Sequence, residues 1–204
     1  MQLSLPPLHE LAKSARSPIT ALPLTTEAFV PFGQVLMAWA EANAAPKGII
    51  VTSANQHTAH KYHNLSRIER SYPAERNAYT GFSVYRSTPV GAIPGGEWEV
   101  KILERHPCTN QAFIPMGSSG GIREDELSNT GRAYLVVVAL NGDDDKPDLH
   151  TLRAFVATTS QGIVYNTGVW RKYITFYVLQ AEMTHITYRS SHDYIGEGMS
   201  TLST

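Results

Sequence analysis

The stretch YLVVVALNGDDDKPDLHTLRAF, residues 134–155, carries the pattern that decides the fold class. A valine-rich apolar run, Tyr134–Leu140, is followed by a cluster of Asn, Gly, Asp and Pro, and a second apolar run begins at Ala154. β-Branched and aromatic runs bounded by turn-forming residues are typical of β-strands. The stretch therefore predicts strands separated by a turn.

The same succession of apolar runs and turn clusters, such as TPVGAIPGG and MGSSGG, extends along most of the chain. A short helix is predicted over residues 25–32, with Thr25 or Thr26 as its cap and Gly33 at its end. Many short strands without a long helix indicate an all-β sandwich or barrel. The predicted strands are Val35–Ala38, Ile49–Ser53, Tyr79–Thr88, Trp98–Arg105, Ala112–Met116, Tyr134–Leu140, Ala154–Thr158, Ile163–Tyr165, Ile174–Leu179 and His185–Tyr188.

Length and composition favour one domain in a reducing compartment. The 204 residues are 42% hydrophobic and 17% charged, so there is enough apolar material for one core. A formal net charge of -1 gives no long-range attraction to nucleic acid or anionic lipid, and no apolar run is long enough to span a membrane. The single cysteine, together with the lack of a signal-peptide pattern, predicts a cytoplasmic protein. We expect a flexible N-terminal arm over residues 1–20 and a single domain over 21–204.

The segment EWEVKILERH contains the best acid–base candidates. Trp98, Val100 and Ile102 alternate with charged residues, so on a strand they share one face. The same period places Glu104 and His106 on that apolar face. Ionisable groups on a buried face are costly unless they are paired or functional. A carboxylate beside an imidazole suits acid–base work, and the alternative is a surface salt bridge at a strand end.

The segment QHTAHKYH places His57, His60 and His63 three residues apart. On a helix these side chains would share one side, as metal ligands can, whereas on a strand they would not. No HxH, HExxH or CxxC motif is present, so we expect loop histidines, with no metal and no cofactor. We expect Cys108, in ERHPCT, to be a small apolar residue at a strand end, and not a thiolate nucleophile.

Arginines and one aromatic segment supply candidates for binding a small anion. Arg86 ends a predicted strand and Arg153 begins one, and a guanidinium can bind a carboxylate through two hydrogen bonds. The alternative for each is a surface ion pair. In QGIVYNTGVWRKYITF, polar and aromatic residues suit a pocket wall; alternatively, Trp170 is core and Arg171 with Lys172 forms a solvated edge. The pocket candidates in this segment are Tyr165, Asn166, Trp170, Arg171 and Lys172.

Several strings resemble the ureidoglycolate lyase family, in family order and over most of the chain from residue 22 to 176. LERHPCTNQAFIPMG, at 103–117, resembles the block LERHP…QAFIPM of that family. YLVVVAL…DDKPDLHTLRAF, at 134–155, resembles its block VVVVAL…DKPDLSTLRAF. KYHNLSRIE, at 61–69, is similar to a family segment RYHDLA, and PLTTEAFVPFGQVL, at 23–36, to the opening helix and strand.

The resemblance implies a cupin-like (jelly-roll) β-barrel with a few short helices, usually a homodimer, that acts on a small molecule without a redox cofactor. Family members split ureidoglycolate into glyoxylate and urea in purine or allantoin breakdown. The implied elimination needs a base for the carbinol proton, an acid for the departing urea nitrogen, and cations or amides for the carboxylate. We assign His106 the acid–base role with Glu104 orienting it, and Arg86 or Arg153 the carboxylate. The positions that match the family in type are His63, Arg86, Glu104, Arg105, His106, Gln111, Arg153, Gln161, Tyr165 and Trp170, of which His63 and Gln111 join the substrate-binding candidates.

The chain departs from the family pattern between residues 161 and 173. The family reads QGVNYH…VWHHP, and here Asn166, Arg171 and Lys172 replace the three histidines and Tyr173 replaces the proline. Imidazole-to-cation changes leave a site that binds anions but has less acid–base capacity near neutral pH. One alternative is therefore a diverged isomerase, cyclase or lyase for a larger apolar metabolite. Another is a non-catalytic small-molecule binder or interaction protein on the same scaffold.

Overall fold

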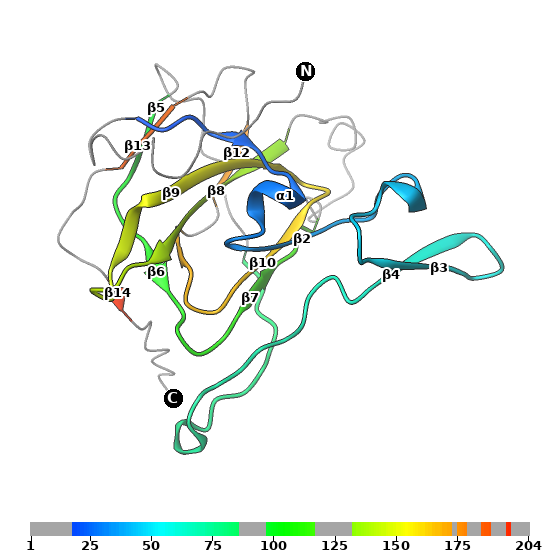
Figure 1. Cartoon of the computed structure of the whole chain (residues 1–204), viewed down its shortest axis with the longest axis horizontal. Helices are drawn as coiled ribbons and strands as arrows, with labels where there is room; N and C mark the ends of the chain where they lie inside the picture. Colours follow the sequence, from blue (N-terminus) through cyan, green and yellow to red (C-terminus); the bar gives the residue numbers. More distant parts are fainter. Residues whose placement is uncertain are drawn as a thin grey trace.

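The chain folds into a mostly β structure with a few short helices (Figure 1). The computed structural model describes residues 18–85, 97–116, 132–172, 175–178, 185–188 and 195–196, and the side chains of 18–85, 100–116 and 133–172. The helices are α1 (Thr26–Phe29), η1 (Ala42–Ala44) and η2 (Ala74–Arg76). The strands are β1 (Leu22–Pro23), β2 (Gly33–Leu36), β3 (Ile50–Ala54), β4 (Ala59–His63), β5 (Glu97–Val100), β6 (Glu104–Arg105), β7 (Gln111–Phe113), β8 (Arg132–Asn141), β9 (Pro147–Thr158), β10 (Gly162–Tyr165), β11 (Trp170–Arg171), β12 (Thr175–Val178), β13 (His185–Tyr188) and β14 (Ile195–Gly196).

Two sheets form the body of the molecule. The larger has seven strands in the order β1-β9-β8-β11-β6-β14, with β12 also paired to β8, and the smaller has three in the order β2-β10-β7. Two-stranded sheets pair β13 with β5 and β3 with β4. The all-β prediction is therefore confirmed, and the antiparallel sheets agree with a cupin-like fold. Within the described residues, the paired strands do not close into a complete ring.

The main hydrophobic core lies between the two large sheets. Its aromatic centre is Phe29 of α1, whose ring contacts Phe155 edge-on at 5.7 Å and Tyr165 at 6.1 Å between centroids. We call the surface of the seven-stranded sheet that faces this core the inner face. The opposite surface, which packs on a second core around Trp170, is the outer face. Successive residues of β8 enter the two cores in turn, which explains why its valine-rich run shows no polar alternation.

The short helix begins where the sequence predicts but ends earlier than residue 32, at Phe29, and residues 30–32 form a turn that leads into β2. The Thr25 hydroxyl accepts a hydrogen bond from the Ala28 N–H at 3.2 Å, which caps α1. Gly33 then starts β2, where a Cβ atom would lie 1.9 Å from the carbonyl oxygen of Val164 on β10. Only glycine allows the strands to approach this closely, so Gly33 fixes the first residues of β2 against β10.

Strand register places a row of charged residues on the inner face. Val138 on β8 pairs with Arg153 on β9 and with Arg171 on β11, and Arg171 pairs with Glu104 on β6. Directly paired residues project from the same face of a sheet. Because Val138 belongs to the core between the sheets, Arg153, Arg171 and Glu104 all project toward the three-stranded sheet.

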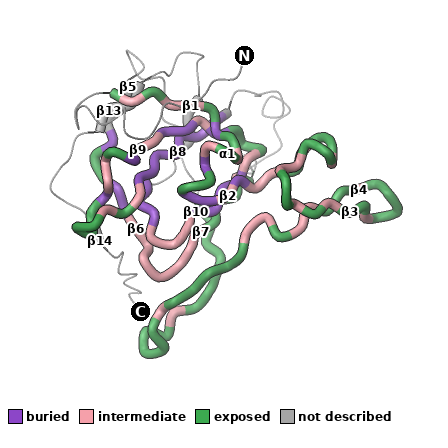
Figure 2. The backbone as a smooth tube through the Cα atoms, viewed as in Figure 1, coloured by how far each residue is buried: buried purple, intermediate pink, exposed green. Residues whose placement is uncertain are grey.

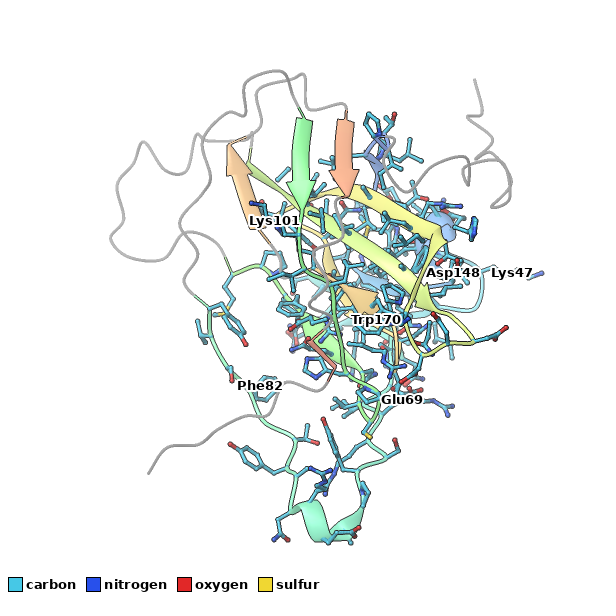
Figure 3. The ribbon with its side chains drawn as sticks, turned by 90° about the vertical axis from the view of Figure 1, so that its left-hand side faces the viewer. Lys47, Glu69, Phe82, Lys101, Asp148 and Trp170 are labelled. Carbon is cyan, nitrogen blue, oxygen red and sulfur yellow. The ribbon has the colours of Figure 1, made fainter. Side chains whose placement is uncertain are left out.

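The predicted strand Tyr79–Thr88 is wrong for residues 79–85, and residues 86–88 lie outside the described part of the chain. Residues 79–85 run without strand pairing along an extended loop that leaves the body of the molecule (Figure 2). The Phe82 side chain is fully exposed there, on a stretch of chain outside the sheets (Figure 3). An apolar run without a partner strand does not form a stable strand by itself.

The predicted strand Trp98–Arg105 is broken into two pieces. β5 ends at Val100 and pairs with β13, whereas β6 begins at Glu104 and pairs with β11 and β14. The irregular residues between them reset the alternation, so Ile102 is 42% exposed and Leu103 is only 1% exposed. The alternation predicted for Ile102 is therefore wrong. Glu104 is buried as predicted, but it projects from the inner face, whereas Val100 packs in the outer core, so the predicted shared face is wrong as well.

Other expectations fall partly outside the described residues. Most of the expected arm, up to residue 17, lies outside them. The division into an arm over residues 1–20 and one domain over 21–204 stays a prediction. Among the helices that the structure describes, none has the length and apolar character needed to cross a membrane.

Candidate active site between the two sheets

Two short loops cross from one large sheet to the other and carry polar residues at their ends. Residues 106–110 connect β6 to β7, and residues 166–169 connect β10 to β11. The loops are joined by a hydrogen bond from the Gly168 N–H to the His106 carbonyl at 3.0 Å. The strand residues that flank these loops are Glu104, Gln111, Tyr165 and Arg171. The topology therefore gathers residues from distant parts of the sequence in one place between the sheets.

Arg171 is the centre of this group and is almost completely buried, with 2% of its surface exposed. Its guanidinium donates a hydrogen bond to the side-chain oxygen of Gln111 and lies 3.7 Å from a carboxylate oxygen of Glu104. The same guanidinium lies over the ring of Tyr165, 5.1 Å from the centroid. A buried cation is tolerated only where it is paired and hydrogen-bonded, and these residues supply that environment.

Tyr165 is also fully buried, and its ring belongs to the core between the sheets. Its hydroxyl has no hydrogen-bond partner among the described residues. Burial, followed by the proximity of Tyr134 and Glu104, raises the pKa of this phenol well above its ordinary value of 10.0. Tyr165 is therefore a neutral hydrogen-bond donor at physiological pH.

Arg153 completes the inner-face row on the other side of Val138. One guanidinium nitrogen donates to the carbonyls of Leu152 at 2.7 Å and His150 at 3.3 Å. The other terminal nitrogen is buried and has no partner among the residues that the structure describes. Burial lowers the pKa of Arg153 below its ordinary value but leaves it a cation at neutral pH. Arg153 can thus offer a donor and an uncompensated charge to an anion.

Amide and hydroxyl groups lie near the loop over residues 166–169. The Gln34 side chain donates to the Asn166 side-chain oxygen at 2.9 Å and accepts from the Ser66 hydroxyl at 2.9 Å. Asn166, one of the predicted pocket residues, is therefore held in place at the start of the loop that precedes β11. Gln34 was not predicted, because one amide in FGQVL gives no periodic signal. His106 is half-buried in the other loop, and no hydrogen bond or ion pair joins its ring to Glu104.

Other predicted residues lie away from the inner face. Trp170 is buried in the core on the outer face, and its indole N–H donates to Asn141 at 2.9 Å. Arg105 lies on the same side, with its guanidinium 5.1 Å from the centroid of the Trp170 ring. The interpretation of Trp170 as core is thus correct, but Arg171 as a solvated edge is wrong. Arg86 and Tyr173 lie outside the described residues.

Two further predicted substrate-binding residues, Lys172 and His63, have other contacts than the residues of the inner face. Lys172 is half-buried, its backbone N–H donates to the Val137 carbonyl at 3.0 Å, and burial lowers its pKa below 10.5. His63 ends β4, and its ring nitrogen lies 2.8 Å from the Thr52 hydroxyl on the adjoining strand. Because β4 is a strand, His60 and His63 project from opposite faces.

Within the described parts of the chain, no three acidic, histidine or cysteine side chains are grouped as a metal site would require.

This buried set of ionisable and amide side chains, inside a cupin-like β fold, has the charged and hydrogen-bonding groups that binding of a small polar ligand requires. This class of site agrees with the comparison of the sequence with known protein families. The family model described as Ureidoglycolate lyase matches residues 16–195. The chain therefore belongs to the ureidoglycolate lyase family.

Individual relatives give the same result. The chain is 37% identical over 158 residues to a ureidoglycolate lyase of Schizosaccharomyces pombe, an alignment that covers 74% of each chain. It is 36% identical over 152 residues to the Escherichia coli O139:H28 ureidoglycolate lyase, with 74% of this chain and 76% of the relative covered. The Saccharomyces cerevisiae ureidoglycolate lyase is 32% identical over 158 residues, with 74% and 75% covered.

Proposed function

We propose that this chain is a carbon–nitrogen lyase that splits ureidoglycolate into glyoxylate and urea. Family membership supports the reaction, and the inner-face row supports the substrate class. In that row Arg171 is balanced by Glu104, whereas Arg153 has a buried nitrogen without a partner among the described residues. A site with one uncompensated guanidinium suits a substrate with one carboxylate.

The reaction is an elimination that balances without water or a redox partner. A base removes the proton from the carbinol hydroxyl, and the oxygen electrons form the carbonyl of glyoxylate. The C–N bond breaks, its electron pair moves to the urea nitrogen, and an acid protonates that nitrogen. The protein must therefore supply a carboxylate ligand, a proton acceptor and a proton donor.

Arg153 is proposed as the carboxylate ligand. Its guanidinium projects from the inner face beside Val138, and its unpaired nitrogen is buried, so a bound carboxylate would satisfy it. Charge-assisted hydrogen bonds of this kind contribute about 1.5–3 kcal/mol each. Arg86 remains a second candidate from the sequence.

His106 is proposed as the proton acceptor. It lies directly after β6 in the loop that Gly168 contacts, at the same end of the sheets as Tyr165 and Gln111. An imidazole is suited to accept a proton near neutral pH. The sequence-based role of Glu104 was to orient this imidazole. Because the Glu104 carboxylate contacts Arg171, we propose instead that it holds Arg171 in place.

The test is a direct assay with purified protein and ureidoglycolate, following glyoxylate and urea above the spontaneous background. The wild type should release both products in equal amounts. His106→Ala should lower turnover by about 100-fold or more if the imidazole takes the proton. An unchanged rate in a folded His106→Ala protein would remove this residue from the mechanism.

We also propose that the chain acts in the cytoplasm as a homodimer, as the family resemblance implies. Exposed apolar side chains on the loop after β4, including Ile68, Tyr79, Phe82 and Val84, provide surface of the kind that interfaces cover. Light scattering after size-exclusion chromatography should give twice the 22.5 kDa chain mass. Fractionation of source cells should place the protein with cytoplasmic markers. A monomer in solution would contradict the proposed homodimer, and recovery with the membrane fraction would contradict the proposed cytoplasmic location.

A further inference from the structure

Two buried tyrosines in the core between the sheets differ in how their hydroxyl groups are satisfied. The Tyr134 hydroxyl donates to the Gln161 carbonyl at 2.5 Å. The Tyr165 hydroxyl has no partner among the described residues, although its side chain is fully buried. A buried hydroxyl without a hydrogen bond is costly, on the order of 1–3 kcal/mol. A phenylalanine would pack the same core without that cost, so the hydroxyl needs another explanation.

The surroundings of Tyr165 are those of a group that exchanges a proton. Its ring lies beneath the Arg171 guanidinium at 5.1 Å, and its strand neighbour across the ladder is Gln111. A cation over the ring favours the phenolate over the phenol, because it compensates the negative charge. Burial has the opposite effect and keeps the proton on the oxygen in the resting state. The site thus holds a neutral phenol and already contains the cation that would stabilise its anion.

We propose that Tyr165 is a catalytic residue that donates its hydroxyl proton to the departing urea nitrogen as the C–N bond breaks. The bond electrons pass to nitrogen, the phenol O–H bond breaks, and a new N–H bond forms on urea. The tyrosinate that remains is stabilised by Arg171. The proton that His106 takes from the carbinol hydroxyl then returns to Tyr165, directly or through solvent, which restores both groups. The inference rests on the lyase function proposed above.

The same step explains why a cation occupies position 171. Glu104 and Gln111 hold the Arg171 guanidinium in place, so its charge stays above the Tyr165 ring. A preorganised charge beside a developing anion lowers the barrier without reorganisation at the moment of reaction. Arg171 acts here through Tyr165 and is a positioning residue for the proton donor.

The experiment compares Tyr165→Phe with Tyr134→Phe, a matched loss of one phenolic hydroxyl from the same core. Steady-state kinetics with ureidoglycolate and urea-induced unfolding are measured for both variants. Tyr165→Phe should lower kcat by about 100-fold or more and change KM by less than about threefold, because the hydroxyl acts in the transition state. Its midpoint of unfolding should be equal to or higher than that of the wild type, because an unsatisfied hydroxyl is removed.

Tyr134→Phe should show the reverse pattern, with a lower midpoint of unfolding and an unchanged kcat, because it loses a buried hydrogen bond outside the site. A third protein carries fluorotyrosine at position 165, which ionises at lower pH. This variant should retain turnover. As pH is raised, its rate should begin to fall at a lower pH than the rate of the wild type, because the proton donor is lost earlier.

The outcomes separate the two proposals. If the wild type releases glyoxylate and folded Tyr165→Phe keeps kcat within about threefold, Tyr165 is not the donor while the lyase function stands. A wild type with no turnover overturns the lyase function and the donor role together. A Tyr165→Phe protein that loses stability as Tyr134→Phe does would show that the hydroxyl has a structural role.

Discussion

Two neighbouring residues of β6 form ion pairs on opposite faces of the sheet, Glu104 with Arg171 of β11 and Arg105 with Asp145 of the turn after β8. On the inner face, Glu104 and Arg171 are almost completely buried, and their charges lie 3.7 Å apart. On the outer face, Arg105 donates two hydrogen bonds to Asp145, at 2.7 and 3.0 Å, but the Asp145 carboxylate is exposed to solvent. Adjacent residues of β6 thus belong to a desolvated pair on one face and to a solvated pair on the other.

The difference between the faces indicates which pair serves function. An exposed ion pair contributes little, about 0–1 kcal/mol, and is weakened by salt. Burying an ion pair often costs as much as the attraction returns, so a buried pair is weak evidence for stability. The outer pair therefore ties the turn after β8 to β6. The inner pair is retained, we infer, because the reaction needs a fixed cation beside Tyr165 and Arg153.

The largest expected effect comes from breaking the inner pair. Arg171→Met leaves the Glu104 carboxylate buried without its cation, which should lower the free energy of unfolding by about 3–5 kcal/mol. Turnover of ureidoglycolate should fall by about 100-fold or more, because the proton donor loses its supporting charge. Chemical denaturation and steady-state kinetics measure the two effects.

The double variant Glu104→Gln with Arg171→Met sharpens this comparison, because it removes both charges. It should recover part of the lost stability but none of the lost turnover. Recovery of turnover in the double variant would show that the pair is only structural.

The second effect concerns Arg153, the other cation of the inner face. Arg153→Gln keeps hydrogen-bonding capacity but removes the charge proposed to hold the carboxylate. The KM for ureidoglycolate should rise by about 10- to 100-fold, while kcat changes less, because a charge-assisted hydrogen bond of about 1.5–3 kcal/mol is lost. An unchanged KM would show that another residue binds the substrate carboxylate, and Arg86 would be the first candidate.

A smaller effect is expected on the outer face at Trp170. Trp170→Phe removes the indole hydrogen bond to Asn141 and weakens the contact with the Arg105 guanidinium. The free energy of unfolding should fall by about 1–2 kcal/mol. Equilibrium denaturation measures this loss, and a decrease as large as that of Arg171→Met would contradict the contrast between the faces.

The smallest effect is the pH dependence of the outer pair. Hydrogen bonds from Arg105, then from Asn141, lower the pKa of Asp145 in the folded protein. Its stabilising contribution is therefore present above the unfolded pKa of about 3.9 and is lost as pH falls through the folded pKa. The difference in Tm between wild type and Asp145→Asn should be small and constant from pH 5 to 7, and should vanish at lower pH. A difference that grows on acidification would have the wrong sign.

Local sequence patterns predicted the elements that depend on neighbouring residues. The Thr25 cap and the valine-rich strand β8 follow from composition and period within a few residues. The Tyr79–Thr88 run has the same composition as a strand, but residues 79–85 lack pairing. Pairing is a tertiary property, so composition alone gave the wrong result there.

The candidate site was predicted only in part, because its pairing joins residues far apart in the sequence. Arg171 lies next to Lys172 in VWRKY, which looks like a solvated edge. Its burial is possible because Glu104 and Gln111, more than 50 residues away, supply a charge and an amide oxygen. Single-sequence patterns report the face of a strand but not the partner opposite it. Likewise, no local sequence pattern indicated that the predicted strand Trp98–Arg105 is interrupted between Val100 and Glu104.

The most direct test of the functional difference between the two faces is the initial rate of glyoxylate release from ureidoglycolate, above the spontaneous background. The wild type, Glu104→Gln on the inner face and Asp145→Asn on the outer face are compared at equal concentration of folded protein. We predict turnover by the wild type, an unchanged rate for Asp145→Asn, and a loss of about 100-fold for Glu104→Gln. Equal rates for the two variants, or no turnover by the wild type, would contradict the assignment of the inner face as the site of reaction.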